Sequence, residues 1–158
     1  MSIIELLYPQ HKIISIVGMA KNSGKTVTLN RIIEDAIDSS ITLGLTSTGR
    51  DGESQDIVTK TEKPSIYAEE GTLVATATET LELGDAKIEI LDITDYNTPL
   101  GRIAIGRVKE SGYIQIAGPQ TNKGIRAVSE IMLKLGAQLV LIDGAINRVA
   151  SASPSVSE

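Results

Sequence analysis

The sequence predicts an α/β fold, a three-layer sandwich around a mostly parallel sheet, with a strand meander in residues 87–117. Three observations support this prediction. Apolar runs at 13–17 and 139–142 are nearly continuous, as is typical of strands that are covered on both faces. A helix-patterned segment follows the first run, and another precedes the second. Polar loops containing glycine follow the strands predicted to be parallel.

Length and composition favour one domain, residues 1–158, with its own hydrophobic core. The chain has no cysteine, which excludes disulfides and cysteine metal sites. Its net charge of −5 disfavours non-specific binding to nucleic acid, and four tyrosines are its only aromatic residues. No leader pattern and no apolar run of membrane-spanning length is present, so we expect a cytoplasmic protein with no membrane partner.

The first half of the chain contains a predicted strand, helix and strand. After the run at 13–17, apolar residues recur at near-helical spacing from Lys25 to about Ile37, and residues 41–45 form a second apolar run. A helix that joins two parallel strands forms a right-handed βαβ unit. Ligands collect beyond the carboxyl ends of such strands. We therefore expect the loop after the first strand and the polar loop 46–53 to lie at the same edge of the sheet.

The middle of the chain has weaker signals. Residues 72–83 are rich in threonine and are ambiguous between helix and strand. Residues 96–101 have turn chemistry and lie between two alternating segments, which predicts a meander that either extends the sheet or forms a flap. The predicted strands are 64–68, 87–93, 102–108 and 113–117.

The last third is clearer. Thr121 is a predicted helix N-cap, Gly136 is a predicted residue after the helix end, and residues 139–144 form a buried strand that contains Asp143. The terminal residues 153–158 have the pattern of a helix start. Two interpretations stay open: the chain is the N-terminal part of a longer protein, or it ends in a disordered serine-rich tail.

The most specific motif is the loop Gly18-Met19-Ala20-Lys21-Asn22-Ser23-Gly24-Lys25-Thr26-Val27. It lies between a predicted strand and a predicted helix, which is the setting of a phosphate-binding loop. There the unpaired N–H groups and the dipole of the helix start favour phosphate. Five residues separate the glycines instead of the usual four, and the alternative is a glycine turn that caps a helix. The predicted nucleotide-binding residues are Gly18, Ala20, Lys21, Asn22, Ser23, Gly24, Lys25, Thr26 and Val27.

Several side chains are candidates for chemistry at this loop. Lys25 would contact the β- and γ-phosphates, and the Thr26 hydroxyl would bind Mg²⁺. Asp143, which lies near the end of an apolar strand, and Asp51, in the loop after the second strand, are candidate metal ligands. We assign the catalytic roles to Lys25 and Asp51 and regard Asp92 as a weaker metal candidate. Lys21 either contacts phosphate or a partner subunit, or is a solvated lysine.

The nucleotide expected is ATP, bound with Mg²⁺. The pair Asn122-Lys123 superficially matches the start of the guanine-recognising pattern Asn-Lys-x-Asp, but the fourth residue is Ile125. No other residues in the sequence indicate guanine recognition.

Residues 18–27, with the spacing Gly-x5-Gly-Lys-Thr-Val, resemble the loop of dethiobiotin synthetase-like P-loop NTPases. This resemblance implies a P-loop NTPase fold that binds Mg-ATP. That family has a second motif, Lys-Pro-x-x-Thr-Gly, where this chain has residues 45–49 without the lysine and proline. Because that lysine helps to handle the diamine substrate, the resemblance supports nucleotide binding and not biotin-pathway carboxylation.

A second resemblance covers nearly the whole chain. Residues 17–27, 71–76 and 142–145 are similar to the P-loop subunit of the lysine 5,6-aminomutase reactivase family. The implied role is ATP-driven release of damaged cobalamin from an adenosylcobalamin-dependent aminomutase, with a partner ATPase subunit.

Three functions remain as hypotheses. The first is an ATP-hydrolysing switch or chaperone that acts on a protein partner, either an aminomutase or a partner ATPase subunit. The second is a small-molecule kinase or ligase of the dethiobiotin synthetase type. The third is a module that binds nucleotide without hydrolysing it. A homodimer is compatible with all three.

Overall fold

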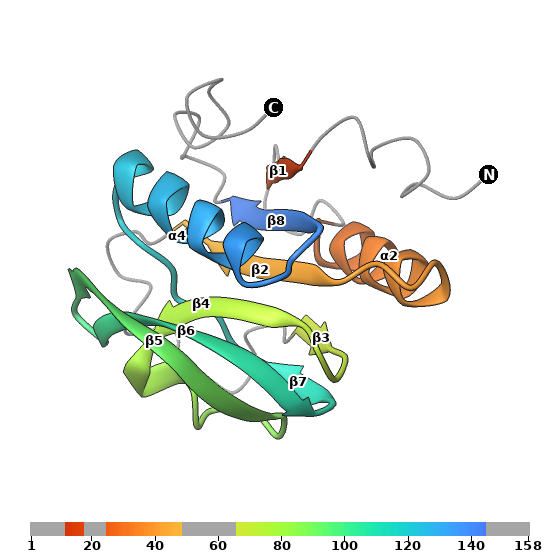
Figure 1. Cartoon of the computed structure of the whole chain (residues 1–158), viewed down its shortest axis with the longest axis horizontal. Coiled ribbons are helices and arrows are strands. Elements are labelled where there is room, and N and C mark those ends of the chain that lie inside the picture. The colour runs from red at the N-terminus through yellow and green to blue at the C-terminus, as the bar shows by residue number, and fades with distance from the viewer. Residues whose placement is uncertain (1–11, 18–24, 49–65, 145–158) are drawn as a thin grey trace.

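The computed structural model describes residues 12–17, 25–48 and 66–144. This part of the chain forms a six-stranded sheet, in the order β1-β8-β2-β4-β6-β5, and a separate two-stranded sheet of β3 and β7 (Figure 1). The elements are β1 (Ile13–Val17), α2 (Lys25–Asp38), β2 (Leu43–Ser47), β3 (Ile66–Ala68), β4 (Leu73–Ala77), the 3₁₀ helix η1 (Thr78–Thr80), β5 (Lys87–Thr98), β6 (Gly101–Glu110), β7 (Gly112–Ile114), α4 (Asn122–Lys134) and β8 (Leu139–Gly144).

The large sheet is mostly parallel, as the sequence predicts. Strands β1, β8, β2 and β4 run parallel, and β6 and β5 extend the sheet in antiparallel pairings. Strands β1 and β2, joined through α2, are parallel but not neighbours, because β8 lies between them. Strand β8, the last described strand in the sequence, therefore lies inside the parallel region, between β1 and β2.

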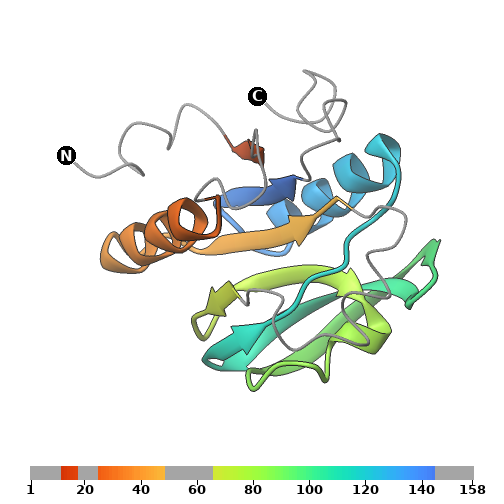
Figure 2. The same ribbon diagram turned by 180° about the vertical axis from the view of Figure 1, so that it is seen from behind.

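Among the described residues, the sheet separates two hydrophobic cores, one containing α2 and the other α4. In β8, Leu139 and Leu141 belong to the core that contains α2, whereas Val140 and Ile142 belong to the core that contains α4. Because successive side chains of a strand point to opposite faces, the two helices cover opposite faces of the sheet. Figure 1 shows α4 on the near side, and Figure 2, from behind, shows α2 nearest the viewer. Strands β3 and β7 pack on the same face as α2.

Helix α4 begins and ends where the local sequence predicts. The Thr121 hydroxyl accepts a hydrogen bond from the Gly124 N–H at 3.0 Å, which satisfies a donor of the first turn. Beyond the C-cap Leu135, Gly136 has φ +125°, a conformation that glycine adopts without steric cost. Both capping predictions are confirmed.

Strand β2 lies two residues later than predicted. The expected strand was 41–45, but the Ile41 N–H donates to the Ala36 carbonyl and so belongs to the connection after α2. At the other end, Thr46 and Ser47 continue the parallel pairing opposite Ile142 and Asp143 of β8. The polar residues that were predicted to form a loop are therefore the end of a buried strand.

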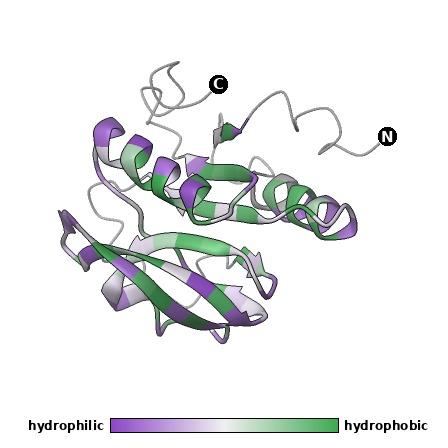
Figure 3. Cartoon of the chain, in the orientation of Figure 1, coloured by the Kyte–Doolittle hydropathy of each residue, from purple (hydrophilic) through white to green (hydrophobic). Residues whose placement is uncertain are grey.

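The middle of the chain resolves into strands and turns. Of the ambiguous residues 72–83, the first part is strand β4, buried between β2 and β6, and the next turn is η1. The predicted meander is found only in part: β5 and β6 form an antiparallel pair that extends the large sheet, whereas β7 pairs with β3 in the second sheet. Figure 3 shows hydrophobic residues along β2, β4 and β8, and more polar residues on β5.

Three predicted boundaries in this region were wrong. Strands β5 and β6 are longer than predicted, and β5 runs through most of the expected turn at 96–101. Strand β7 ends at Ile114, so residues 115–117 are not part of the predicted strand. They cross the ends of β2 and β4 instead, in hydrogen bonds to side chains of those strands.

Candidate functional site

The carboxyl ends of β1, β8 and β2 meet at one edge of the sheet. Val17, the last residue of β1, is paired with Gly144 of β8, and Asp143 lies between Ile16 of β1 and Ser47 of β2. Helix α2 begins at Lys25, so residues 18–24 connect the carboxyl end of β1 to the amino terminus of α2. The strand before the motif and the helix after it, which a phosphate-binding loop requires, are therefore both present.

Asp143 occupies the central position at this edge. Its side chain is partly buried, and the carboxylate oxygen Oδ1 is shielded from solvent. Its main-chain carbonyl accepts a hydrogen bond from the Thr48 N–H at 3.1 Å, which fixes the end of β2 beside β8. The strand register thus presents one carboxylate between the strand that leads into the motif loop and the strand that leads toward Asp51.

The hydroxyl groups at the end of β2 have structural partners. The Ser47 hydroxyl donates to the Ile116 carbonyl at 3.1 Å and accepts from the Gly118 N–H at 3.1 Å. The Thr46 hydroxyl donates to the Ala75 carbonyl of β4 at 2.8 Å. Both residues are buried, so these bonds satisfy groups that water does not reach.

The end of β4 forms a second set of hydrogen bonds to the segment 116–118. The Thr76 hydroxyl accepts from the Ala117 N–H at 2.8 Å and is hydrogen-bonded to the hydroxyl of Thr80. The Ala77 N–H donates to the Ala117 carbonyl at 2.9 Å. Residues 116–118 are thereby fixed across the carboxyl ends of β2 and β4, next to the candidate site.

These hydroxyl contacts were missed at the sequence level. Residues 46–48 were interpreted only as polar loop residues, and Thr76 as part of an ambiguous segment. The apolar residues that precede Thr46 in β2 are the one local signal that the strand could continue through it. The partners at 116–118 are about 70 residues from Ser47 and 41 residues from Thr76 in the sequence, and no local pattern identifies them.

Most of the predicted nucleotide loop lies outside the described residues. This applies to Gly18, Ala20, Lys21, Asn22, Ser23 and Gly24, and to the catalytic and metal candidate Asp51. The backbone of Lys25, Thr26 and Val27 forms the first turn of α2, in agreement with the prediction that the helix begins there. Of the metal candidates, the structure therefore positions the carboxylate of Asp143 at the expected edge.

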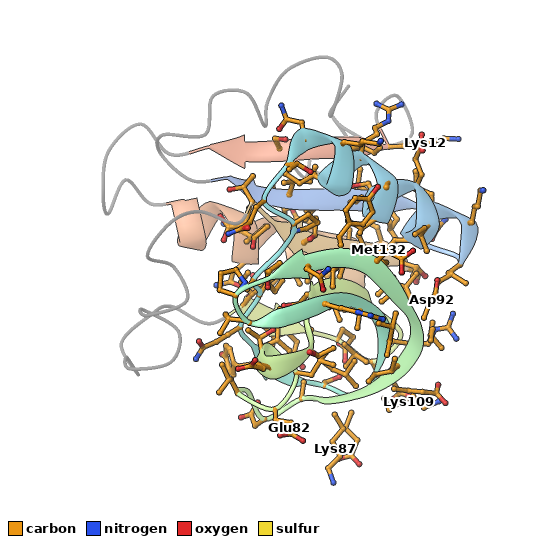
Figure 4. The ribbon with its side chains drawn as sticks, turned by 90° about the vertical axis from the view of Figure 1, so that its left-hand side faces the viewer. Lys12, Glu82, Lys87, Asp92, Lys109 and Met132 are labelled. Atoms are coloured by element: carbon orange, nitrogen blue, oxygen red, sulfur yellow. The ribbon has the colours of Figure 1, made fainter. Side chains whose placement is uncertain are left out.

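Asp92 does not belong to this edge. It lies on β5, at the far end of the sheet order from β1, and its side chain is exposed. Its Oδ1 accepts from the Ile93 N–H at 2.9 Å. In Figure 4 Asp92 lies toward the side of Lys12, which precedes β1, and away from the carboxyl end of β1. The structure does not bring it together with Asp143.

The donor set fits Mg²⁺ bound together with a nucleotide. In the part of the chain that the structure describes, no group of three or more His, Cys, Asp or Glu residues could hold a metal ion. Nucleotide-bound Mg²⁺ does not need such a group, because it takes one or two carboxylates and completes its coordination with phosphate oxygens and water. Asp143 could supply one of these carboxylates, and the Thr26 hydroxyl, by its sequence position, could supply a further oxygen.

Comparisons with known proteins found no match: no family model, no curated protein and no solved structure matches the chain. Neither α2 nor α4, the two α-helices in the described ranges, is long and apolar enough to cross a membrane. The arguments about function therefore depend on the motif and on the geometry of the sheet edge.

Proposed function

We propose that this chain is a Mg-ATP-binding P-loop NTPase domain. The observation that carries the proposal is the juxtaposition at the carboxyl edge of the sheet. There, the carboxyl end of β1 lies beside Asp143 of β8, and the sequence Gly-x5-Gly-Lys-Thr runs from the end of β1 into the start of α2. In open α/β sheets this edge is where ligands bind.

In this proposal, each residue has a role in binding the nucleotide or Mg²⁺ that follows from its chemistry. The N–H groups of residues 20–26 would face the phosphates and, with the start of α2, would provide a positive electrostatic potential there. Lys25 would bind the β- and γ-phosphate oxygens, and the Thr26 hydroxyl and Asp143 would hold Mg²⁺. The metal neutralises charge on the phosphates when it is bound. Asp51 lies in the connection after β2 and is assigned to the attacking water.

The proposed role is an ATP-driven switch or chaperone that reactivates an adenosylcobalamin-dependent aminomutase, with a partner ATPase subunit. The family resemblance of residues 17–27, 71–76 and 142–145 motivates the identity of the client. Hydrolysis would remove the γ-phosphate contacts, and the change would pass to the partner through the connection that follows Thr48, which contains Asp51. Ser47, anchored to Ile116 and Gly118, gives this connection a fixed starting point.

The test measures phosphate release from Mg-ATP by the parent and by Asp143→Asn, with and without an aminomutase inactivated by damaged cobalamin. We expect slow basal hydrolysis in the parent, an increase with the aminomutase, and loss of Mg²⁺-dependent hydrolysis in the variant with a smaller change in ATP binding. Asp92→Asn is the matched control, because that carboxylate is exposed on β5, and it should behave as the parent.

Two results would contradict the proposal. Equal hydrolysis by the parent and Asp143→Asn would reject the assignment of the metal ligand. Rapid turnover of ATP with an amine or carboxylate metabolite, in the absence of any protein partner, would instead indicate a dethiobiotin synthetase-like ligase or kinase.

A further inference from the structure

A cavity of about 210 Å³ opens at the edge of the sheet opposite the candidate nucleotide site. It lies where β2 and β4 begin, between the end of α2 and the turn that joins β3 to β4. Its apolar lining consists of Ile33, Ile37, Ile41 and Leu43, of which Ile33 and Leu43 are fully buried core residues. The cavity is therefore a depression in a packed core, with walls fixed by the fold.

The polar wall of the cavity is an ordered turn that carries two carboxylates, Glu69 and Glu70. The Thr72 N–H donates to the Glu69 carbonyl at 3.0 Å, which closes the turn. The Ser111 hydroxyl donates to Glu69 Oε1 at 2.5 Å and accepts from the Glu70 N–H at 2.8 Å. These bonds hold the acidic turn in place before any ligand arrives, which lowers the entropic cost of binding.

The opposite wall is also electrostatically negative. The cavity is bordered by the C-terminal end of α2, through Ile37 and Ser40, and this end of a helix carries partial negative charge. The last turn of α2 contains no basic residue. None of the described residues that line the cavity is a lysine or an arginine. A cation placed there would interact favourably with both walls.

We propose that this cavity docks a lysine or arginine side chain presented by a partner protein. The apolar lining suits the methylene stem, and Glu69, Glu70 and the end of α2 suit the cationic head. The volume is below the ~300–1,000 Å³ of sites that enclose drug-sized ligands and matches a single long side chain. A second copy of this chain is a poor occupant because its net charge is −5, so the partner surface is basic.

This inference goes beyond the proposed function and does not depend on nucleotide binding. The test therefore uses the full chain without nucleotide and follows its backbone amides by NMR. The probe is N-acetyl-lysine methylamide, with the norleucine analogue as a match for the stem without the charge. We expect saturable shifts that are concentrated at Leu43, Gly71 and Thr72, and much weaker shifts with the norleucine analogue.

The matched variants separate a specific contact from general acidity. Glu69→Gln/Glu70→Gln removes both charges, while the amide oxygen of Gln at 69 can still accept from Ser111. We expect the double variant to bind the lysine probe roughly three- to tenfold more weakly, as the loss of two exposed charge contacts implies. Glu82→Gln, at an exposed position that is not part of the cavity lining (Figure 4), should bind as the parent does. The salt dependence of binding to the parent is a second test, which needs no variant. Added salt should weaken binding of the lysine probe, because it screens the charge contact.

Four outcomes would overturn the proposal. The first is the absence of saturable shifts at the cavity amides. The second is equal binding of the norleucine analogue, and the third is unchanged affinity in the double variant. The fourth is much tighter binding of cadaverine than of the lysine probe, which would assign the cavity to a free diamine instead of a protein partner.

Discussion

Two buried hydroxyl residues, Ser47 and Thr76, determine how the segment after β7 crosses the sheet. Each side chain bonds to main-chain groups of residues 116–118. These bonds stabilise the fold mainly because they satisfy buried donors and acceptors. An unpaired buried group lowers stability by more free energy than a formed hydrogen bond adds. Ser47 is also the last residue of β2, so its bonds fix the point at which the connection to Asp51 begins.

Ser47→Ala should destabilise the protein by about 1–3 kcal/mol. The substitution leaves the buried Gly118 N–H and the Ile116 carbonyl without their hydroxyl partner. Denaturant unfolding measures the change in the free energy of unfolding. Ser39→Ala, at an exposed position after α2, is the control and should change stability by less than ~0.5 kcal/mol. Equal effects at the two positions would refute the structural role of Ser47.

Gly118→Ala should be more damaging, because a Cβ at this position would lie 1.8 Å from the Ser47 carbonyl oxygen. Backbone must move to relieve that overlap, at a cost of about 3 kcal/mol or more. Gly44→Ala is the comparison: its Cβ would lie 3.1 Å from Met132 Sδ, a flexible side-chain atom, so the cost should be smaller. Thermal unfolding of both variants tests the order, and a reversed order would contradict it.

Among the elements, α4 is the one whose limits follow most directly from local sequence. The Thr121 hydroxyl caps its start, so Thr121→Ala should reduce stability by about 1 kcal/mol. Thr121→Ser keeps the capping oxygen and should restore most of the loss. Chemical denaturation of the two variants, with helix content followed by circular dichroism, measures this difference. A serine variant as unstable as the alanine variant would show that the cap is not the cause.

Elements that are defined by residues close together in the sequence were predicted better than elements that depend on pairing with distant residues. Strand β8 and helix α4 were predicted with their observed limits, because a continuous apolar run and capping residues are local. Strand β2 was misplaced by two residues, because Thr46 and Ser47 become strand only through pairing with β8. The position of β8 between β1 and β2 depends on contacts about 100 residues apart, which no local pattern encodes.

The candidate site was predictable to a similar extent. The motif and Asp143 were identified from the sequence, and the register brings Asp143 beside the end of β1. Asp92 was a candidate only because it follows apolar residues, and the order of the strands separates it from the site. The contacts of Ser47 depend on the path of residues 116–118, so their structural role could not be inferred locally.

At the scale of the whole molecule, the parallel sheet has two edges with different character. Its carboxyl edge carries the Asp143 carboxylate and the connection to α2, and its amino edge carries the cavity beside Glu69 and Glu70. Strands β2 and β4 extend from one edge to the other. Of the strands that border the candidate nucleotide site, β2 also borders the cavity, so a partner and a nucleotide would lie at opposite ends of that strand.

The most direct measurement is calorimetric titration of the full chain with Mg-ATP, in the parent and in Lys25→Ala. We expect saturable binding to the parent, and an affinity loss of about 1.5–3 kcal/mol in the variant, the cost of a lost charge-assisted contact to phosphate. The absence of binding heat in the parent at millimolar Mg-ATP, or equal affinities in the two proteins, would contradict the phosphate-binding role of residues 18–26.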